Sequence, residues 1–168
     1  MLYDDQATRF DDRAGVPADA AEAVARELSA LVGLAEGWTL LDVGCGTGSL
    51  SLPLLRLPIR YTGFDRSAAM LEVFRERAEA AGLAAELHVA DGNARWPAED
   101  AGVDVVFSAR ALHHLHPAHV AAEARRVIRP GGWLATGRVR RPPDSPKSVL
   151  RRQMRRMLQA EGFAGRSH

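Results

Sequence analysis

The residues best suited to bind a ligand in this chain read Leu-Leu-Asp-Val-Gly-Cys-Gly-Thr-Gly, from Leu40 to Gly48. An apolar run leads to the carboxylate of Asp42, and glycines follow at the alternate positions 44, 46 and 48. Glycine permits a positive φ and lets a ligand approach the backbone with no Cβ in the way. Together with the leucine-rich segment 49–57, the pattern predicts a buried strand, a tight turn and a helix. The unpaired N–H groups at the start of such a helix suit an anionic or electron-rich part of a ligand.

Two ligand classes compete for this loop. A dinucleotide-binding loop reads G-x-G-x-x-G, but Ser49 stands where its third glycine would be. A carboxylate at Asp42 would also repel a pyrophosphate, whereas it would suit a ligand with an ammonium group. We therefore favour the ammonium-bearing ligand over a nicotinamide dinucleotide. A tight turn without any ligand remains the alternative.

Acids follow two further predicted strands. Asp65 ends the segment 60–65, about 20 residues after the loop, and at that spacing an acid in α/β nucleotide folds accepts hydrogen bonds from ribose hydroxyls. Its two carboxylate oxygens match two vicinal hydroxyls. Asp65 could instead cap the helix predicted at 67–81, and both roles can coexist. A third strand, 86–90, leads to Asp91-Gly92-Asn93, a pattern that also forms surface turns.

The stretch from Asp42 to Gly48 resembles motif I of the class I methyltransferases, which bind S-adenosylmethionine. The segments that lead to Asp65, Asp91 and Ser108 resemble later parts of the same family in the same order, and the resemblance extends over residues 3–138. It implies S-adenosylmethionine as the cofactor, with Asp91 accepting from the adenine amino group. The cofactor-binding residues that the resemblance implies are Asp42, Gly44, Cys45, Gly46, Gly48, Asp65, Arg66, Met70, Asp91, Gly92, Asn93 and Ser108.

The resemblance and the strand pattern imply the same fold. Predicted strands alternate with helices, which indicates an α/β fold with a doubly wound, mostly parallel sheet and helices on both faces. These strands lie at 39–43, 60–64, 86–90, 103–107 and 133–138. We expect a single domain over 1–168. Its parts would be an N-terminal cap and helix at 1–33, the cofactor-binding core at 38–139, and a linker with a basic C-terminal helix at 140–168.

The resembled family usually adds a C-terminal strand hairpin after the fifth strand, and this chain ends too soon for both strands. One edge of the sheet should therefore be open, and an open edge is a site for strand pairing. A homodimer mate or another partner could cover it. One alternative is that the chain is a truncated or non-catalytic cofactor-binding subunit that acts through a partner.

Methyl transfer from a sulfonium requires the acceptor about 3 Å from the methyl group, in line with the breaking bond. A base is needed only where the acceptor must lose a proton. His113 and His114 follow the fourth predicted strand, and histidine can take a proton near neutral pH, so His113 is the catalytic candidate and His114 the second. Either ring could instead pack, cap a helix or be solvated. No carboxylate or cysteine joins them at ligand spacing, so we expect no metal site.

The class of acceptor is constrained by the residues after the fourth strand. Enzymes that methylate exocyclic amines of nucleic acids carry Asn/Asp-Pro-Pro-aromatic at this place, whereas this chain reads Ser-Ala-Arg-Ala from Ser108 to Ala111. A small-molecule acceptor is therefore favoured. Residues 138–168 hold nine Lys and Arg against two Asp and Glu, so an RNA methyltransferase that contacts RNA phosphates is the alternative.

The composition fits a protein of the cytoplasm. The single cysteine, Cys45, cannot form an internal disulfide, which agrees with a reducing compartment. No apolar run approaches the ~20 residues of a membrane span. The polar, acidic N-terminus does not resemble a signal peptide. We therefore expect cytoplasmic localisation and no membrane partner.

Overall fold

The computed structural model describes residues 16–138, together with 144–145, 149–150, 152–154 and 156–157. The chain divides into two units, Met1–Gly137 and Arg138–His168. The expected N-terminal cap falls mostly on residues 1–15, which lie outside the described residues. None of the described helices is long and apolar enough to cross a membrane.

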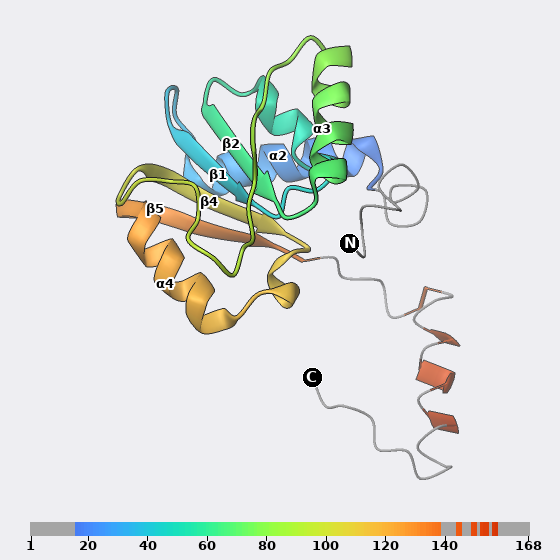
Figure 1. Cartoon of the computed structure of the whole chain (residues 1–168). Coiled ribbons are helices and arrows are strands. Elements are labelled where there is room, and N and C mark those ends of the chain that lie inside the picture. The colour runs from blue at the N-terminus through green and yellow to red at the C-terminus, as the bar shows by residue number, and fades with distance from the viewer. Residues whose placement is uncertain (1–15, 139–143, 146–148, 151, 155, 158–168) are drawn as a thin grey trace. The chain divides into compact units, whose positions relative to one another are not determined.

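Five parallel strands form the sheet of the first unit, in the order β3-β2-β1-β4-β5 (Figure 1). The strands are β1 (Thr39–Val43), β2 (Arg60–Asp65), β3 (Glu86–Val89), β4 (Val103–Ala109) and β5 (Ile128–Gly137). The chain order reverses between β1 and β4, and doubly wound sheets bind ligands at the carboxyl ends of the strands beside such a switch point. The predicted α/β fold is confirmed.

Helices cover both faces of this sheet (Figure 1). On one face lie α2 (Ala18–Val32) and α3 (Ala68–Ala80), where Phe74 of α3 joins Leu40 of β1 in one buried cluster. On the other face lies α4 (Pro117–Val127), which packs against Leu41 of β1. Neighbouring β1 residues are thus buried against opposite helices, because side chains alternate along a strand. This burial on both faces of the sheet explains why positions 40 and 41 both hold apolar residues.

Two predicted elements differ in the structure. The segment 49–57 holds only a short 3₁₀ helix, η2 (Leu52–Arg56). Pro53, near its start, has no N–H to donate and disfavours a longer α-helix here. The strand predicted from 133 begins earlier, at Ile128, but its pairing with β4 is irregular before Trp133. The regular part of β5 is therefore the part that was predicted.

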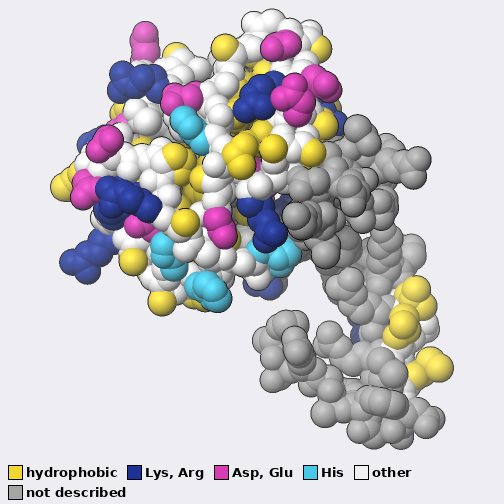
Figure 2. Space-filling model, in the orientation of Figure 1, with side chains coloured by type: hydrophobic (Ala, Val, Ile, Leu, Met, Phe, Trp, Pro, Cys, Tyr) yellow, Lys and Arg dark blue, Asp and Glu magenta, His cyan; other side chains and the backbone are white. Residues whose placement is uncertain are grey.

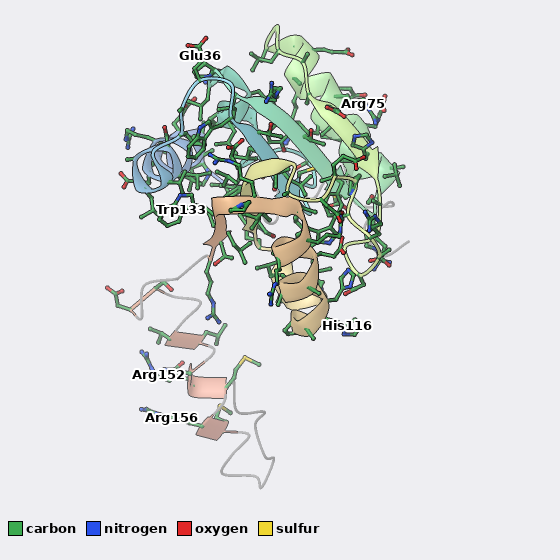
Figure 3. All side chains as sticks on the ribbon, turned by 90° about the vertical axis from the view of Figure 1, so that its left-hand side faces the viewer. Glu36, Arg75, His116, Trp133, Arg152 and Arg156 are labelled. Carbon is green, nitrogen blue, oxygen red and sulfur yellow. The ribbon has the colours of Figure 1, made fainter. Side chains whose placement is uncertain are left out.

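No strand follows β5 among the described residues, so β5 is an edge of the described sheet. Trp133 and Leu134 of this strand are 45% and 42% exposed, and Figure 3 shows Trp133 on the strand. On the face of the first unit drawn in Figure 2, basic and acidic side chains are interspersed.

In the second unit, the described helical residues lie between Val149 and Met157, and the apolar side chains of Leu150, Met154 and Met157 are exposed.

A mostly buried ion pair on α4 anchors the connection between β3 and β4. The Glu123 carboxylate accepts from the backbone N–H of Trp96 at 2.7 Å and pairs with Arg126 at 2.7 Å. Arg126 also donates to the carbonyl groups of Trp96 and Ala98. The hydrogen bond from Arg126 is the main reason that the pKa of Glu123 is lowered to about 2. The connection that begins at Asp91 is thereby fixed to α4.

Glu123→Ala is expected to lower the free energy of unfolding by about 2 kcal/mol at pH 7, because buried donors lose a charged acceptor. Since the folded-state pKa is depressed from 4.5 to about 2, the stabilisation is fully present above pH 4.5 and is lost as the pH falls toward 2. Urea denaturation at pH 7, 5 and 3 measures this, with the exposed Arg125→Ala on the same helix as the control. Equal midpoints for wild type and Glu123→Ala at pH 7 would contradict the prediction.

Candidate cofactor site

The three alternate glycines after β1 are required by the shape of the loop. Gly44, Gly46 and Gly48 have φ values of 73°, 55° and 72°, a region that residues with a Cβ rarely adopt. The backbone N–H groups of Gly44 and Cys45 both donate to the carbonyl oxygen of Phe64, at 2.9 and 3.1 Å, so the loop starts against the end of β2. The sequence predicted this turn correctly.

The loop does not lead into an α-helix, so the helix N-terminus predicted directly after it is wrong. The N–H of Gly48 donates to the carbonyl of Cys45 at 3.1 Å, and the N–H of Leu52 donates to the carbonyl of Gly48 at 2.8 Å. These turns use N–H groups that a helix start would leave unpaired. A ligand at this loop must therefore be held by the loop backbone itself and by neighbouring side chains.

The surroundings of the three glycines differ. A Cβ added at Gly44 would overlap the Cβ of Ala111, and one added at Gly48 would overlap the Phe74 ring. At Gly46 a Cβ would have no heavy atom within 4 Å. Gly46 is therefore the glycine of this loop that faces open space, and there a ligand can reach the backbone.

Asp65 at the tip of β2 lies beside this opening. Its Oδ2 accepts from the N–H of Gly46 at 3.1 Å, and its Oδ1 accepts from the N–H of Ser67 at 2.9 Å. Ser67 is itself the N-cap of α3, because its hydroxyl accepts from the N–H of Met70. A carboxylate has about four acceptor sites, so two remain for a ligand's hydroxyls. The helix-capping and ligand-binding roles considered for Asp65 are thus compatible.

Asp42 does not face the opening, which corrects the orientation we expected. It is 1% exposed, and its Oδ2 accepts from the Tyr61 hydroxyl at 2.8 Å and from the Ser51 hydroxyl. The Asp42 side chain is therefore buried beneath the loop, where it meets Tyr61 of the neighbouring strand β2. Burial raises the pKa of Asp42 to about 6; the two hydrogen bonds oppose this rise, and the charge of Asp65 adds to it. Asp42 ties β1, β2 and the end of the loop together.

Asp42→Asn is expected to gain stability relative to the wild type as the pH rises, by about 2 kcal/mol between pH 4 and 7.5. A carboxyl whose folded-state pKa is raised from 3.8 to about 6 stabilises the fold fully below pH 3.8 and loses this contribution as the pH rises through 6. Asparagine has no such proton to lose. Thermal unfolding at pH 4, 6 and 7.5 measures the difference, with the exposed Asp19→Asn as the control. A difference that does not change with pH would refute the assignment.

The thiol of Cys45 is free and half-buried in the loop. Burial, and then the charges of Asp42 and Asp65, raise the pKa of its thiol well above the usual value. A thiol in this state is a poor nucleophile at neutral pH. Its Sγ also lies close to Gly63 of β2, where a Cβ would come within 3.0 Å of it. A contact between Cys45 and a cofactor stays a prediction.

The residues after β3 form a turn. Oδ1 of Asp91 accepts from the N–H of Asn93 at 2.9 Å, and Oδ1 of Asn93 accepts from the N–H of His116 at 2.8 Å. Gly92 is buried, and a Cβ there would come within 2.9 Å of the Leu115 side chain. The surface-turn alternative is therefore correct for the local structure. The adenine contact of Asp91, which is exposed, stays a prediction.

The segment after β4 crosses the carboxyl end of the sheet, which no sequence pattern indicated. Arg110 starts it with φ 68°, a left-handed conformation unusual for a residue with a Cβ. Ala111 then lies against Gly44, and Leu115 lies against Gly92. The segment therefore borders both the loop and the turn after β3. Ser108 before it is 1% exposed and donates to the carbonyl of Val43 at 2.8 Å, so its hydroxyl joins β4 to β1 instead of facing a ligand as expected.

The two histidine candidates lie together on this segment. Both are exposed in the 3₁₀ helix η3 (Leu112–His114), with ring centroids 3.8 Å apart. Partial burial, then the charges of His113 and Arg66, lower the pKa of His114, and Asp65 opposes this. His114 is therefore within electrostatic reach of the ribose candidate Asp65. Of the other predicted cofactor residues, Arg66 is exposed and the Met70 side chain is buried.

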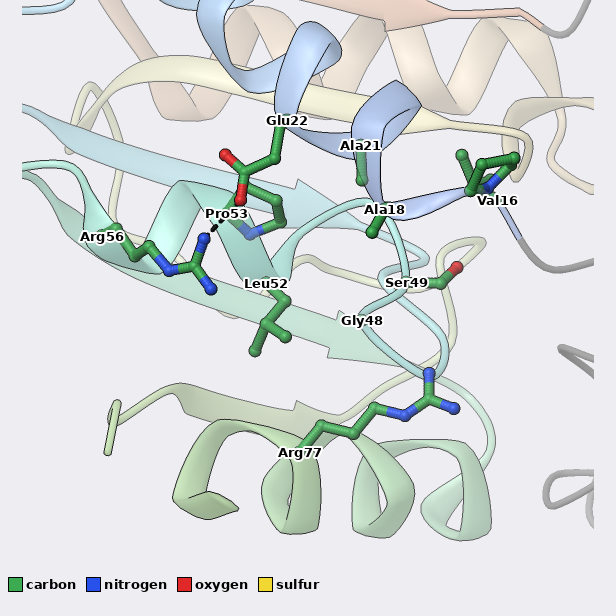
Figure 4. Close-up of a pocket in the computed structure, with 11 residues that line it drawn as sticks. Val16, Ala18, Ala21, Glu22, Gly48, Ser49, Leu52, Pro53, Arg56 and Arg77 are labelled. Carbon is green, nitrogen blue, oxygen red and sulfur yellow. Dashed lines mark hydrogen bonds and ion pairs between the residues drawn. The ribbon is translucent and has the colours of Figure 1, made fainter. Parts of the chain in front are cut away.

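A pocket of about 510 Å³ lies beside the glycine loop (Figure 4). It is lined by the first turns of α2, by η2, by Gly48 and Ser49 of the loop, and by Arg77 of α3. Arg56 and Glu22, which both line it, form an ion pair. Its lining includes Gly48 but neither Gly46 nor Asp65, so it adjoins the outer side of the loop.

The residues from 40 to 132 match the family model described as a methyltransferase domain. The chain belongs to this family. The resemblance to class I methyltransferases is thus confirmed on a match that covers the loop, Asp65, Asp91 and the segment after β4.

Relatives of this methyltransferase-domain chain include the 27-O-demethylrifamycin SV methyltransferase of Amycolatopsis mediterranei (strain S699), which is 33% identical over 76% of this chain and 48% of the relative. A ubiquinone biosynthesis O-methyltransferase of Cereibacter sphaeroides (strain KD131 / KCTC 12085) is 33% identical over 71% of this chain and 48% of the relative. The chain therefore spans about half the length of these two relatives.

Among solved structures, a putative S-adenosyl-L-methionine-dependent methyltransferase from Methanococcus maripaludis matches with a TM-score of 0.73. It is 20% identical and covers 95% of this chain and 74% of that structure. At this identity the likeness supports the fold alone. It agrees with the parallel sheet and with helices on both of its faces.

Proposed function

We propose that the chain binds S-adenosylmethionine and takes part in methyl transfer to a small-molecule acceptor. The observation that carries the proposal is the placement of Asp65, which accepts from Gly46 of the glycine loop and keeps acceptor sites beside the open face of that glycine. Membership of the methyltransferase-domain family supports the same cofactor.

The residues present fit this cofactor. Asp65 would accept from the ribose hydroxyls, the backbone around Gly46 would lie against the ligand, and the exposed Asp91 would accept from the adenine amino group. When bound, S-adenosylmethionine supplies an electrophilic methyl group on a sulfonium. The chain's own task is to hold the ligand and the acceptor in line.

A proton acceptor is available if the methyl acceptor is a hydroxyl. We propose His113, with His114 beside it, for this role, because both rings are exposed on the segment that borders the loop. The lowered pKa of His114 keeps its imidazole neutral near pH 7, and a neutral ring can take a proton. The names of the relatives, a demethylrifamycin methyltransferase and a ubiquinone biosynthesis O-methyltransferase, favour a small hydroxylated acceptor.

Two alternatives remain as proposals. The basic residues of the second unit would suit RNA; Arg152 and Arg156 are described there, and Arg151 and Arg155 lie outside the described residues. A non-catalytic subunit would need a partner, and the exposed Trp133 and Leu134 at the β5 edge would suit a homodimer mate or another protein. A cytoplasmic location is also only proposed.

Incubation with methyl-labelled S-adenosylmethionine distinguishes the proposed function from the two alternatives. One arm offers catechols and other phenols, a second offers tRNA, and Asp65→Ala is the inactive control. We expect label in a phenolic product and none in RNA. Label only in RNA favours the first alternative, and cofactor binding without transfer favours the subunit. A folded chain that binds no S-adenosylmethionine overturns the proposal.

A further inference from the structure

Helix α3 and the strand before it hold three consecutive residues of the glycine loop. Asp65 accepts from the N–H of Gly46, Arg77 donates to the carbonyl of Thr47 at 3.2 Å, and the Phe74 ring covers Gly48. The side chains of Phe74 and Arg77 come from positions three residues apart, which lie on one face of a helix. Figure 4 shows Arg77 reaching from α3 toward the loop at Gly48 and Ser49.

The contact from Arg77 differs from the other two because it acts on a carbonyl group of the loop. Thr47 is 2% exposed, so its backbone has little access to water, and a buried carbonyl needs a hydrogen-bond partner. A guanidinium is a charged donor, and hydrogen bonds from charged donors are roughly twice as strong as neutral ones. The Thr47 carbonyl shares one peptide plane with the N–H of Gly48, so its orientation also fixes that N–H. Arg77 is thus placed to fix the loop from outside the ligand site.

We propose that Arg77 is a positioning residue for the cofactor loop, which acts through Thr47 and makes no contact with the cofactor. Because Gly46 directly precedes Thr47, releasing this carbonyl loosens the backbone next to the N–H that Asp65 accepts from. The loop would then sample conformations that do not fit the ligand, and affinity falls by the fraction of time spent in them. The effect on affinity rests on the proposed function, whereas the effect on the loop does not.

The first arm of the test measures hydrogen exchange in the cofactor-free protein. Arg77→Met keeps the apolar stem and removes the donor, and we expect amides in 44–52 to exchange at least fivefold faster while α2 and α4 keep the wild-type rates. Arg75→Met is the matched control, since Arg75 lies on the same helix (Figure 3) and pairs with Glu72 on the surface. Arg77→Lys can still donate to Thr47 and should restore most of the protection. Wild-type exchange in 44–52 of Arg77→Met overturns the proposal.

The second arm titrates the same variants with S-adenosylhomocysteine. We expect Arg77→Met to bind about tenfold more weakly, which is about 1.4 kcal/mol, with Arg75→Met unchanged and Arg77→Lys close to wild type. Faster loop exchange with unchanged affinity overturns the positioning role. If wild type itself binds nothing, the proposed function fails, and the exchange arm still decides whether Arg77 holds the loop. If Arg77→Met does not fold, Arg77→Leu replaces it, because leucine also lacks a donor, and wild-type exchange in 44–52 of that variant overturns the proposal.

Discussion

Gly48→Ala is expected to lower the free energy of unfolding by roughly 4 kcal/mol, the largest effect on stability that we predict for one residue of the loop. Gly48 has φ 72°, and an added Cβ would overlap three atoms of the Phe74 ring. Phe74 is fully buried and packs edge-on against Tyr61, with ring centroids 6.0 Å apart, so the ring cannot yield without disturbing the core. Urea denaturation followed by circular dichroism measures the loss.

Two matched glycines separate overlap from backbone strain. Gly82→Ala, after α3, and Gly46→Ala both place alanine at positive φ with no heavy atom within 4 Å of the new Cβ. Each should cost only about 1 kcal/mol of stability. Gly46→Ala should also lose affinity for S-adenosylhomocysteine, because its Cβ would point into the space proposed for the ligand. If Gly48→Ala were no less stable than Gly82→Ala, the described contact between the Phe74 ring and Gly48 would be contradicted.

Asp65→Ala is expected to weaken binding of S-adenosylmethionine roughly hundredfold, or about 3 kcal/mol. The substitution removes the acceptor proposed for two ribose hydroxyls. It also takes a partner from the N–H groups of Gly46 and Ser67, so the loop loses one of its links to β2, while the bonds of Gly44 and Cys45 to Phe64 remain. Equilibrium dialysis with labelled cofactor measures the change.

The control variants for Asp65 test charge and location. Asp65→Asn keeps one acceptor oxygen and the shape of the side chain, so its affinity should fall between those of wild type and Asp65→Ala. Glu72→Ala removes an exposed acid from α3 and should leave binding unchanged. If Asp65→Ala bound as tightly as wild type, Asp65 would have only the capping role.

The sheet could be predicted from the sequence because its strands are short apolar runs that end at acids or turns. β1 and β2 begin at the residues expected, Thr39 and Arg60. A helix was predicted after the loop, but its short 3₁₀ form could not be. The effect of Pro53 on the leucine-rich segment depends on how the turn before it closes. The earlier start of β5 is likewise a matter of pairing with β4 rather than of local pattern.

The candidate site was predictable where it rests on local geometry. The positive φ of the alternate glycines and the placement of Asp65 follow from spacing within one strand–turn–strand unit. The orientation of Asp42 was not predictable, since it depends on Tyr61 and on Ser51, which meet it only in the folded chain. Arg77 has no signal of its own in the sequence, because its acceptor lies 30 residues away.

A crystal structure of the protein with S-adenosylhomocysteine tests the central claim most directly. The account predicts one ligand at the carboxyl end of β1 and β2, with both ribose hydroxyls about 3 Å from the Asp65 carboxylate and the ligand against the backbone of Gly46. A ligand bound elsewhere, for instance in the pocket beside Arg56, or a ribose that does not meet Asp65, would contradict it.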